Sequence, residues 1–568
     1  MKNKRPGYDG GRRRIIASAA LGVQALLLIG WTLLSLSRLN PYAAAWDEVD
    51  FALALQRFDL LAMQPHFPGY PYFVLGAKLV HYWISDPVLA YDILNVALTL
   101  SSSVPLWFVA RRSLSPAMSG LTVLIVLTAP YLWLQTVSPM SEAAGIAALW
   151  WYLWFLLEAM RRGRRRWIFG ALALFGVVMG IRLSFAPFGL GLVWLGLLQL
   201  VRWRREGKRL LPRAAAYAGA AAGAQLLWVA GLVFSEGGPA GFVQLAGAFV
   251  AGHFSEWGGG IAASPMPPAE RLLRFAGGNV LWTGWFARST ALMLAAAALL
   301  LAAVLRAGAV RPPRADAPAP RAVRGAAARA LGRAADLLRS PPPAAALAAL
   351  GTAYAVWALL AQNIDKPRHI TPLVGILWLL VLSAFRSIGH AAPHTASGPA
   401  AIPPHGQALS GPSATHVTDP PPSAALRWLQ ASGIALASLV LAVQTGVGIA
   451  LLSKQAAERP AVYQLADEVK RLSALHDSKV VVYTWEEARV LEWNRTPPVY
   501  REIYTYPYFL AQLAAQPHAA VYLTDHVLDG FRKQAGTLAG HAKARARFES
   551  STLTDPVYGT ITLYEWIR

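Results

Sequence analysis

The sequence predicts an all-α polytopic membrane protein that carries a small extracytoplasmic α/β domain near its C-terminus. The chain of 568 residues is 55% hydrophobic and only 14% charged, whereas a soluble protein of this size carries about a quarter charged residues. Apolar runs such as 15–37 and 143–160 are long enough to cross a bilayer. These runs are too long and too continuous for barrel strands, so we expect helices.

Alternation of apolar and basic segments predicts the topology. The basic tail 1–14 is expected in the cytoplasm, and the basic clusters at 161–166, 202–209 and 306–333 then all fall on that side. This predicts about eleven spans, with the N-terminus cytoplasmic and the C-terminal domain extracytoplasmic. The expected spans are 15–37, 88–110, 117–135, 142–160, two segments on either side of 182–187, 214–234, 285–305, 343–361, 370–386 and 427–452.

The segments between the spans divide the chain into domains. Residues 1–456 form the transmembrane domain, and its two long external loops, 38–87 and 235–283, have room for re-entrant or interfacial helices. The loops 306–342 and 387–426 are rich in Pro, Ala, Ser and Gly and are expected to be disordered on the cytoplasmic side. Residues 457–568 form the soluble domain, with strands at 479–484, 519–524 and 561–566 and helices at 462–475 and 508–516.

Charge and cysteine content exclude several classes of function. The net charge of +22 lies at helix ends rather than in one patch, which favours cytoplasmic loops in contact with membrane lipid over nucleic-acid binding. The chain has no cysteine, so it has neither disulfides nor a thiolate nucleophile. The first apolar run is too long for a cleaved signal peptide and is expected to remain as an anchor. The abundance of Arg and Ala suggests a GC-rich bacterial source.

The most informative polar feature is the acidic cluster Trp46-Asp47-Glu48-Val49-Asp50, shortly after the first span. Carboxylates at a membrane surface are costly unless they are solvated, paired or used. One of them could accept the proton of a hydroxyl that attacks a sugar carbon. On a helix, Asp47 and Asp50 would share one face and Glu48 would turn aside. A helix start favoured by the helix dipole, or a solvated loop, is the alternative.

Three further groups are candidates on the same side. His66 and Tyr70 lie in a turn rich in Pro and Gly, which would hold them as hydrogen-bonding groups toward the aqueous site. Glu142 opens the fourth span, where a capping role is the alternative. Arg182 lies in an apolar stretch and needs a partner, either a lipid phosphate or a structural carboxylate.

The last cluster, Lys366, Arg368 and His369, stands at the outer start of the tenth span. Arg donates two parallel hydrogen bonds to a phosphate and Lys adds a point charge, while backbone N–H groups at a helix start support the same anion. Anionic lipid headgroups would explain these charges equally well. However, the positive-inside rule disfavours basic residues on the outer side, so a specific role is indicated.

The order of these elements resembles the GT-C superfamily of glycosyltransferases, near its protein O-mannosyltransferase branch. Trp46-Asp47-Glu48-Val49 is similar to that branch's acidic pair, and His66-Phe67-Pro68-Gly69-Tyr70-Pro71 to a downstream His-Pro-Pro-Gly-Tyr-Pro stretch. The segment from Ser141-Glu142 to Gly180-Ile181-Arg182 resembles the middle section of the family. Pro367-Arg368-His369-Ile370-Thr371-Pro372 resembles the start of a late helix. The resemblance covers roughly residues 15–385.

This resemblance implies a membrane enzyme of the cell envelope that uses a polyprenyl-phosphate sugar as donor. The sugar would pass with inversion to an extracytoplasmic hydroxyl on a protein, lipid or polysaccharide. By the same resemblance, Asp47 is the catalytic base, and Glu48 orients substrate or a divalent metal ion; whether a metal takes part stays open. Arg182, Lys366, Arg368 and His369 would hold the leaving phosphate.

Two other classes of function stay open. A lipid or sugar transporter or flippase would place polar residues at the bilayer midplane and often shows internal repeats, and neither is evident here. A polysaccharide polymerase or ligase of another fold would place its basic residues in a large later loop, and His253 and Arg271 in 235–283 keep that possibility open. The donor sugar, the acceptor and the oligomeric state are not encoded in any pattern that we recognise.

Overall fold

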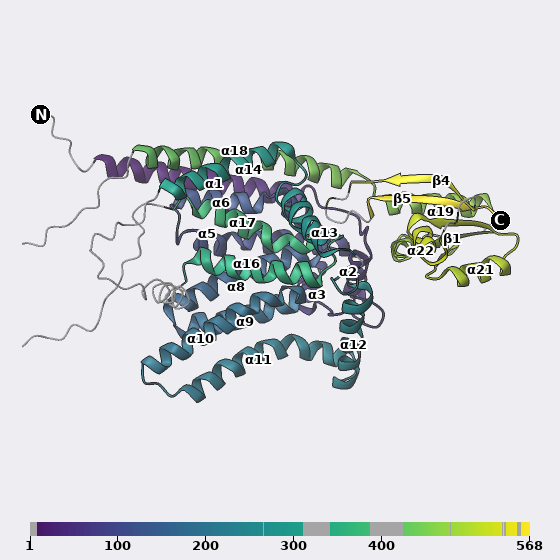
Figure 1. Cartoon of the computed structure of the whole chain (residues 1–568), viewed down its shortest axis with the longest axis horizontal. Helices are drawn as coiled ribbons and strands as arrows, with labels where there is room; N and C mark the ends of the chain where they lie inside the picture. The colour runs from purple at the N-terminus through teal and green to yellow at the C-terminus, as the bar shows by residue number, and fades with distance from the viewer. Residues whose placement is uncertain are drawn as a thin grey trace, which may run out of the picture.

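The computed structural model describes residues 8–309, 341–386 and 424–568, apart from short gaps at 265, 477–478, 537, 539–540, 552 and 554–557. A long bundle of helices carries a small α/β domain at one end (Figure 1). The first helix, α1, starts at the opposite end of the bundle, and the C-terminus lies in the α/β domain.

Most of the bundle consists of α-helices that run roughly along its long axis (Figure 1). Their bounds are α1 Tyr8–Leu36, α4 Pro87–Ser101, α5 Ser103–Ala110, α6 Pro116–Leu127, α7 Pro130–Thr136, α8 Ser141–Arg162, α9 Arg165–Ile181, α10 Leu190–Arg205, α11 Leu210–Ser235, α14 Thr290–Ala309, α16 Pro343–Ala361, α17 Thr371–Ser383 and α18 Ala424–Ala457.

Eight helical segments of the described chain are long and apolar enough to cross a membrane, and the bent pair α6–α7 makes a ninth if it counts as one span. All of the predicted spans are helical, which confirms a polytopic helical protein. Fewer helices than the predicted eleven or so are long enough to cross a membrane, because two of the predicted spans are short: α9 has 17 residues and α17 has 13. These two helices are shorter than the roughly 20 residues that a full crossing needs.

The break between α6 and α7 shows how the interior tolerates a bend of 63°. Pro130 starts α7 and cannot donate a backbone hydrogen bond to the preceding turn. The side chain of Gln444, from α18, donates to the carbonyl oxygen of Ile125 at 2.6 Å and to Thr128 Oγ1 at 2.6 Å. A buried amide thus satisfies polar groups that the break leaves open, as a membrane interior requires.

Both predicted external loops contain helices, which lie at the end of the bundle beside the α/β domain (Figure 1). The first loop holds α2 Trp46–Gln56 and α3 Pro71–His81. The second holds α12 Pro239–Gly252, α13 Pro268–Leu273 and two π-helical segments, His253–Trp257 and Arg274–Trp285. The expectation that these loops have room for further helices is confirmed.

The α/β domain is built on one mixed sheet of five strands in the order β2-β1-β3-β5-β4. Strands β1, β2 and β3 are parallel, and β5 pairs antiparallel with β3 and β4. The three predicted strands correspond to β1, β3 and β5, and the two predicted helices to α19 and α21. The bounds are α19 Ala461–Leu475, β1 Val480–Thr484, α20 Glu487–Trp493, β2 Tyr500–Glu502, α21 Tyr506–Ala515, β3 Ala520–Thr524, α22 Asp525–Ala535, β4 Ala542–Glu549 and β5 Thr560–Trp566.

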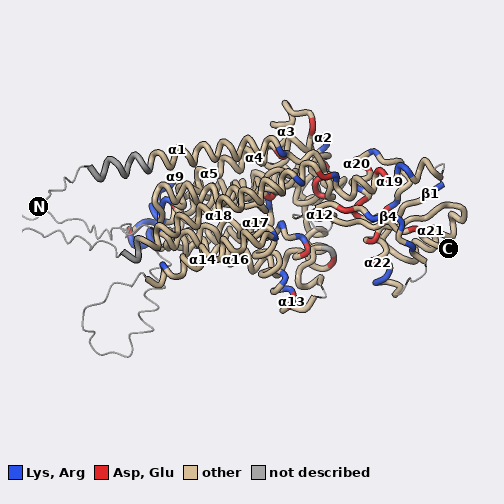
Figure 2. Tube along the Cα trace, turned by 90° about the horizontal axis from the view of Figure 1, so that it is seen from above, with Lys and Arg blue, Asp and Glu red and all other residues tan. Residues whose placement is uncertain are grey.

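The expected cytoplasmic linkers fall mainly on 310–340 and 387–423, which lie outside the described residues. Where they overlap the described chain the expectation of disorder is wrong, because 306–309 end α14 and α18 already begins at Ala424. Lys and Arg gather at the end of the bundle where α8 passes into α9, opposite the α/β domain (Figure 2). Acidic side chains are concentrated toward the other end.

Candidate active site

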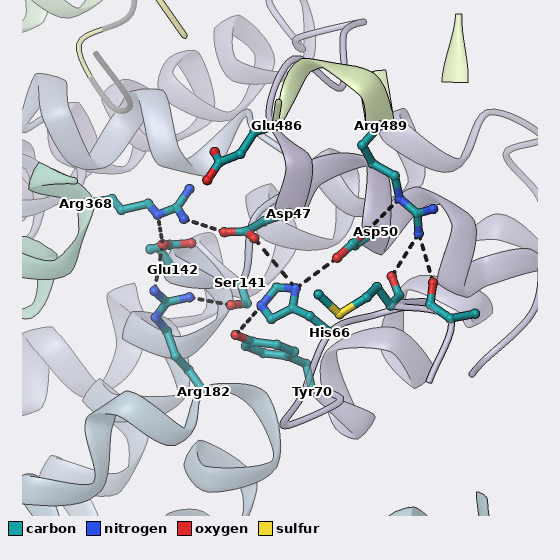
Figure 3. A network of polar contacts seen from close by, with 12 residues as sticks. Asp47, Asp50, His66, Tyr70, Ser141, Glu142, Arg182, Arg368, Glu486 and Arg489 are labelled. Atoms are coloured by element: carbon teal, nitrogen blue, oxygen red, sulfur yellow. Dashed lines mark hydrogen bonds and ion pairs between the residues drawn. The ribbon is translucent and has the colours of Figure 1, made fainter. Parts of the chain in front are cut away.

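The three carboxylates of the acidic cluster point in different directions from helix α2 and have two different roles. Glu48 Oε2 accepts hydrogen bonds from the backbone N–H groups of Ala44, at 2.7 Å, and Ala45, at 3.1 Å. Glu48 therefore satisfies free donors at the start of the helix, as an N-terminal glutamate commonly does. Asp47 and Asp50, one turn apart, both face His66 (Figure 3). The predicted shared face of Asp47 and Asp50, with Glu48 turned aside, is confirmed.

His66 joins these two carboxylates to the turn before α3. Its Nδ1 lies 3.3 Å from Asp50 Oδ2 and 3.7 Å from Asp47 Oδ1, and its Nε2 lies 2.9 Å from the Tyr70 hydroxyl. Tyr70 caps α3 with φ at +47°, a backbone conformation that is strained for a bulky residue and that often marks a functional site.

The preceding Gly69 has φ at +82°, and a Cβ there would come within 2.7 Å of Leu232 in α11. Only glycine fits this close approach of the turn to the bundle. The same turn therefore fixes both His66 and Tyr70 against the membrane helices.

Glu142, at the start of α8, lies buried between two arginines (Figure 3). Arg182 Nη2 is 2.8 Å from Glu142 Oε1, and Arg182 Nη1 donates to Ser141 Oγ at 2.7 Å. Arg368 Nε is 3.5 Å from the same Glu142 oxygen. A buried arginine requires such a partner. The sequence left a lipid phosphate and a structural carboxylate open as partners of Arg182, and in this structure the partner is the carboxylate.

Arg368 connects this pair to α2. Its Nη2 forms a hydrogen-bonded ion pair with Asp47 Oδ2 across 321 positions of sequence. The Asp47 side chain remains 24% exposed, whereas that of Arg368 is only 6% exposed. The carboxylate of the first external loop and the cation beside α17 therefore meet at one place, as the sequence interpretation required.

The second external loop holds the segment that carries Arg368. Arg271 is buried and donates to the carbonyl oxygens of Leu359 and Gln362, both at 2.6 Å, at the C-terminal end of α16. Asn279 donates to the Ile364 carbonyl at 2.6 Å, and His253 Nε2 lies 3.0 Å from the Ala361 carbonyl oxygen. Basic side chains commonly satisfy the last carbonyls of a helix in this way. His253 and Arg271 thus support this turn.

Lys366 and His369 flank Arg368 and complete the basic cluster. Lys366 is half-buried and close enough to Asp47 to act on it electrostatically. The backbone carbonyl of His369 accepts a hydrogen bond from the buried Tyr354 hydroxyl at 2.6 Å. The Nδ1 atom of His369 is buried and has no hydrogen-bond partner among the described residues. Both residues lie beside the network, and among the described residues neither forms an ion pair within it.

The surrounding charges set the protonation of the two aspartates of α2. Burial raises the pKa of Asp47, but the positive charges of His66, Arg368 and Lys366 outweigh this and hold the pKa below its ordinary value. Burial raises the pKa of Asp50, and its pairing with His66 and Arg489 only partly opposes that rise. The geometry thus presents one ionised, partly exposed carboxylate beside several cations.

One member of the network comes from the α/β domain and was not predicted from the sequence. Arg489, in α20, donates from Nε to Asp50 Oδ1 at 3.1 Å. Asp50 was predicted to share a helix face with Asp47 but was given no role of its own, and Ser141 was not predicted as a site residue. Arg489 lies 439 positions from its partner in a helix of ordinary composition, so no local pattern points to it.

A separate group could hold a metal ion. Glu487, Asp525 and His526, at the ends of β1 and β3, offer ligand atoms that lie within 4.8 Å of one another, and this is the one such group in the part of the chain that the structure describes. Burial lowers the pKa of His526, but hydrogen bonding and charge pairing with Glu487 outweigh it and raise the pKa to about 9. His526 Nδ1 and Glu487 Oε1 form a hydrogen-bonded ion pair, and a metal ion bound here would have to displace the proton that they share.

Known proteins are similar to this chain in two ways: solved structures align with most of its length, and one family model matches its middle. Two structures of ArnT from Cupriavidus metallidurans, one bound to undecaprenyl phosphate and one apo, each align with 14% identity and a TM-score of 0.47 over 96% of this chain and 97–98% of theirs. The oligosaccharyltransferase of Archaeoglobus fulgidus aligns with 12% identity and a TM-score of 0.39, over 88% of this chain and 69% of that one. No curated protein sequence matches the chain.

The sequence profile described as dolichyl-phosphate-mannose-protein mannosyltransferase matches residues 66–228. The matched segment contains five residues of the site, which are His66, Tyr70, Ser141, Glu142 and Arg182. Asp47 and Arg368 lie on either side of it, so the match supports the resemblance without assigning them roles. Residues 66–228 thus carry the sequence pattern of that mannosyltransferase family, which confirms the resemblance predicted from the motifs.

Proposed function

We propose that the protein is a membrane glycosyltransferase that moves a sugar from a polyprenyl-phosphate donor to a hydroxyl group of an acceptor outside the cytoplasm. The observation that carries this proposal is the buried contact network at one end of the bundle, in which Asp47 meets Arg368 and Glu142 joins Arg368 to Arg182. The family match over residues 66–228 supports a donor of the dolichyl-phosphate-mannose type.

In the proposed reaction Asp47 is the general base. The acceptor hydroxyl gives its proton to Asp47 while its oxygen forms a bond to the anomeric carbon of the sugar. The bond between that carbon and the phosphate oxygen breaks on the opposite face, and the electron pair leaves with polyprenyl phosphate. Attack opposite the leaving group inverts the anomeric configuration.

The cations stabilise the charge that develops on the phosphate. Arg368 would take this role together with Lys366, and Glu142 holds Arg368 and Arg182 in a fixed orientation. Burial lowers the pKa of the adjacent His369, so its imidazole would contact the phosphate as a neutral hydrogen-bonding group. Arg368 is paired with Asp47. A donor phosphate would compete with Asp47 for the guanidinium, and a carboxylate freed from that pair is a stronger base.

The test is a transfer assay on the protein reconstituted in vesicles. Radiolabelled polyprenyl-phosphate mannose is the first donor, and the envelope fraction of the expression host supplies acceptors. The proposal predicts release of free polyprenyl phosphate together with labelled protein, lipid or polysaccharide. Release of a polyprenyl diphosphate would favour a polymerase or ligase, and donor movement between leaflets without cleavage would favour a flippase. The anomeric configuration of the product, read by NMR, tests inversion.

We also propose that the site faces away from the cytoplasm, because the basic residues gather at the opposite end of the bundle (Figure 2). The chain has no cysteine, so single cysteines can be placed without background. Leu61 lies beside the site and is 77% exposed, and Lys208 follows α10 at the other end of the bundle. We would replace each of them by cysteine in a separate variant, Leu61→Cys and Lys208→Cys. A membrane-impermeant maleimide should label position 61 from outside intact cells and leave position 208 unlabelled. The reverse pattern would overturn the orientation.

A further inference from the structure

The α/β domain and the first external loop share one hydrophobic core. Ala43, Val49 and Ala52, in and just before α2, are buried in the same cluster as Val462 and Leu465 of α19. Tyr463 adds a hydrogen bond from its hydroxyl to the Ala43 carbonyl oxygen at 3.3 Å, and its ring meets that of Tyr42 edge-on at 4.9 Å. The domain is therefore packed against the helix that carries Asp47, in addition to its covalent link through α18.

Arg489 adds a polar clamp to this packing (Figure 3). Besides Asp50, its guanidinium binds the turn before His66, with Nη2 donating to the carbonyl oxygens of Ala62 at 3.0 Å and Met63 at 3.2 Å. The same group lies over the ring of Trp46, at 5.9 Å from its centroid. One side chain of the α/β domain thus ties together the start of α2 and the turn that presents His66.

Asp50 connects Arg489 of the α/β domain to His66 in the site. Its side chain is fully buried, with Oδ1 on Arg489 and Oδ2 on His66 Nδ1 at 3.3 Å. A buried carboxylate without partners is strongly unfavourable, so both contacts are needed to keep it in place. His66 in turn lies between Asp50 and Asp47, and the Tyr70 hydroxyl holds its other nitrogen. The contacts therefore run from Arg489 through Asp50 and His66 to Asp47.

From this arrangement we infer that Arg489 is a positioning residue, through which the α/β domain fixes Asp50 and His66 beside Asp47. The inference rests on the proposed function, since it treats Asp47 as the reacting base. It makes the α/β domain an obligatory part of the active site rather than a separate acceptor-docking module. Loss of the clamp should slow the chemical step, because small misplacements of a base are costly, and should leave donor binding nearly unchanged.

The kinetic test uses a double-mutant cycle on the full-length protein in vesicles, with polyprenyl-phosphate mannose as donor. Arg489→Met keeps the stem over Trp46 and removes the donors, and Asp50→Asn removes the charge that they hold. Each variant should lower kcat on the order of tenfold and change KM for the donor by less than about twofold. The double variant should be no slower than the slower single variant, because the two residues act in one chain of contacts.

Independent effects that multiply to about a hundredfold, or a wild-type kcat in Arg489→Met, would overturn the inference. The matched control is Arg532→Met, an exposed arginine of the same domain that pairs with Asp529 at 2.8 Å. It should keep the wild-type kcat. A wild-type protein that releases no polyprenyl phosphate would instead overturn the proposed function.

A second measurement does not depend on activity. Spin labels at Leu61→Cys and Lys470→Cys, both exposed, report the distance between the first external loop and the α/β domain. The distance distribution should be narrow in the otherwise wild-type chain and broader with Arg489→Met. An unchanged distribution would show that Arg489 does not hold the two parts together, and this too would overturn the inference.

Discussion

Helix α8 carries a glutamate with arginine partners at each of its ends, and the two clusters differ in kind. At the end beside the α/β domain, Glu142 is fully buried and its partners, Arg182 and Arg368, come from distant segments. At the other end, Glu158 pairs with Arg161 and Arg162 of its own last turn and with Arg112. The side chains of Arg161 and Arg162 are 57% and 37% exposed.

This difference between the two clusters distinguishes a candidate active site from the ordinary charge pairing at a helix end. Two of the three Glu158 pairs are local, of the kind that forms wherever such residues stand three or four positions apart on a helix. Solvent screens the guanidinium groups of Arg161 and Arg162, although the Glu158 carboxylate and Arg112 are nearly buried. The Glu142 cluster forms only when several segments of the chain meet, and it excludes water from two arginines. Chemistry requires charges that are preorganised in this second way.

If the Glu142 cluster is the active site, the largest loss of activity is expected at Asp47, the proposed base that pairs with Arg368 of this cluster. Asp47→Asn keeps the shape of the side chain and removes the base, so kcat for sugar transfer should fall about a thousandfold or more. The measurement is the initial rate of polyprenyl phosphate release from reconstituted protein. Full activity in this variant would show that the base has been assigned to the wrong carboxylate.

The next largest effect is expected at Arg368. Arg368→Lys keeps the charge but cannot hold Glu142 and Asp47, or a phosphate, with two separate N–H groups. We expect kcat to fall about a hundredfold, similar to the loss of one preorganised donor at a developing anion. The control is Arg274→Lys, an exposed arginine of the second external loop that pairs with Glu270 at 2.8 Å. Equal rates for both variants would remove Arg368 from the reaction.

Glu142→Gln measures how much the buried charge of Glu142 contributes to stability and activity. The amide leaves Arg182 with Ser141 as its hydrogen-bond acceptor, and a buried charge without its partner is strongly unfavourable. We expect the protein to lose about 3 kcal/mol of stability and transfer to slow about tenfold. Thermal inactivation in detergent and the initial rate give the two numbers. A variant with wild-type stability would show that the network tolerates an uncharged centre.

Glu158→Gln is the matched change at the other end of the same helix and should have the smallest effect. Two of its three arginine partners, Arg161 and Arg162, are partly solvated and can turn to water, so the loss should be about 1–2 kcal/mol, below that of Glu142→Gln, and transfer should stay within twofold of wild type. The same two assays apply. If Glu158→Gln were as damaging as Glu142→Gln, the distinction between the two ends of α8 would be wrong.

Much of the fold could be predicted, because the signals that specify it are local. The apolar runs predicted every helical span segment, although α9 and α17 proved shorter than a full crossing. Short apolar runs predicted β1, β3 and β5 as buried strands. Strand β2, with three residues, is too short to show a pattern, and β4 alternates basic with small residues. The site was predicted as residue types near one surface, and all of its predicted members except Glu48 lie in or beside one network.

The sequence by itself determined that the chain folds into membrane helices with acidic and basic motifs at corresponding helix ends, since helix formation and burial depend on neighbouring residues. Only the tertiary structure decided which carboxylate meets which cation: Asp47 pairs with Arg368 and His66, Glu48 holds the start of its own helix, and Asp50 reaches Arg489 in the α/β domain. Electrostatic partners are chosen by distance in space, and no local pattern records that residues 50 and 489 will pack together.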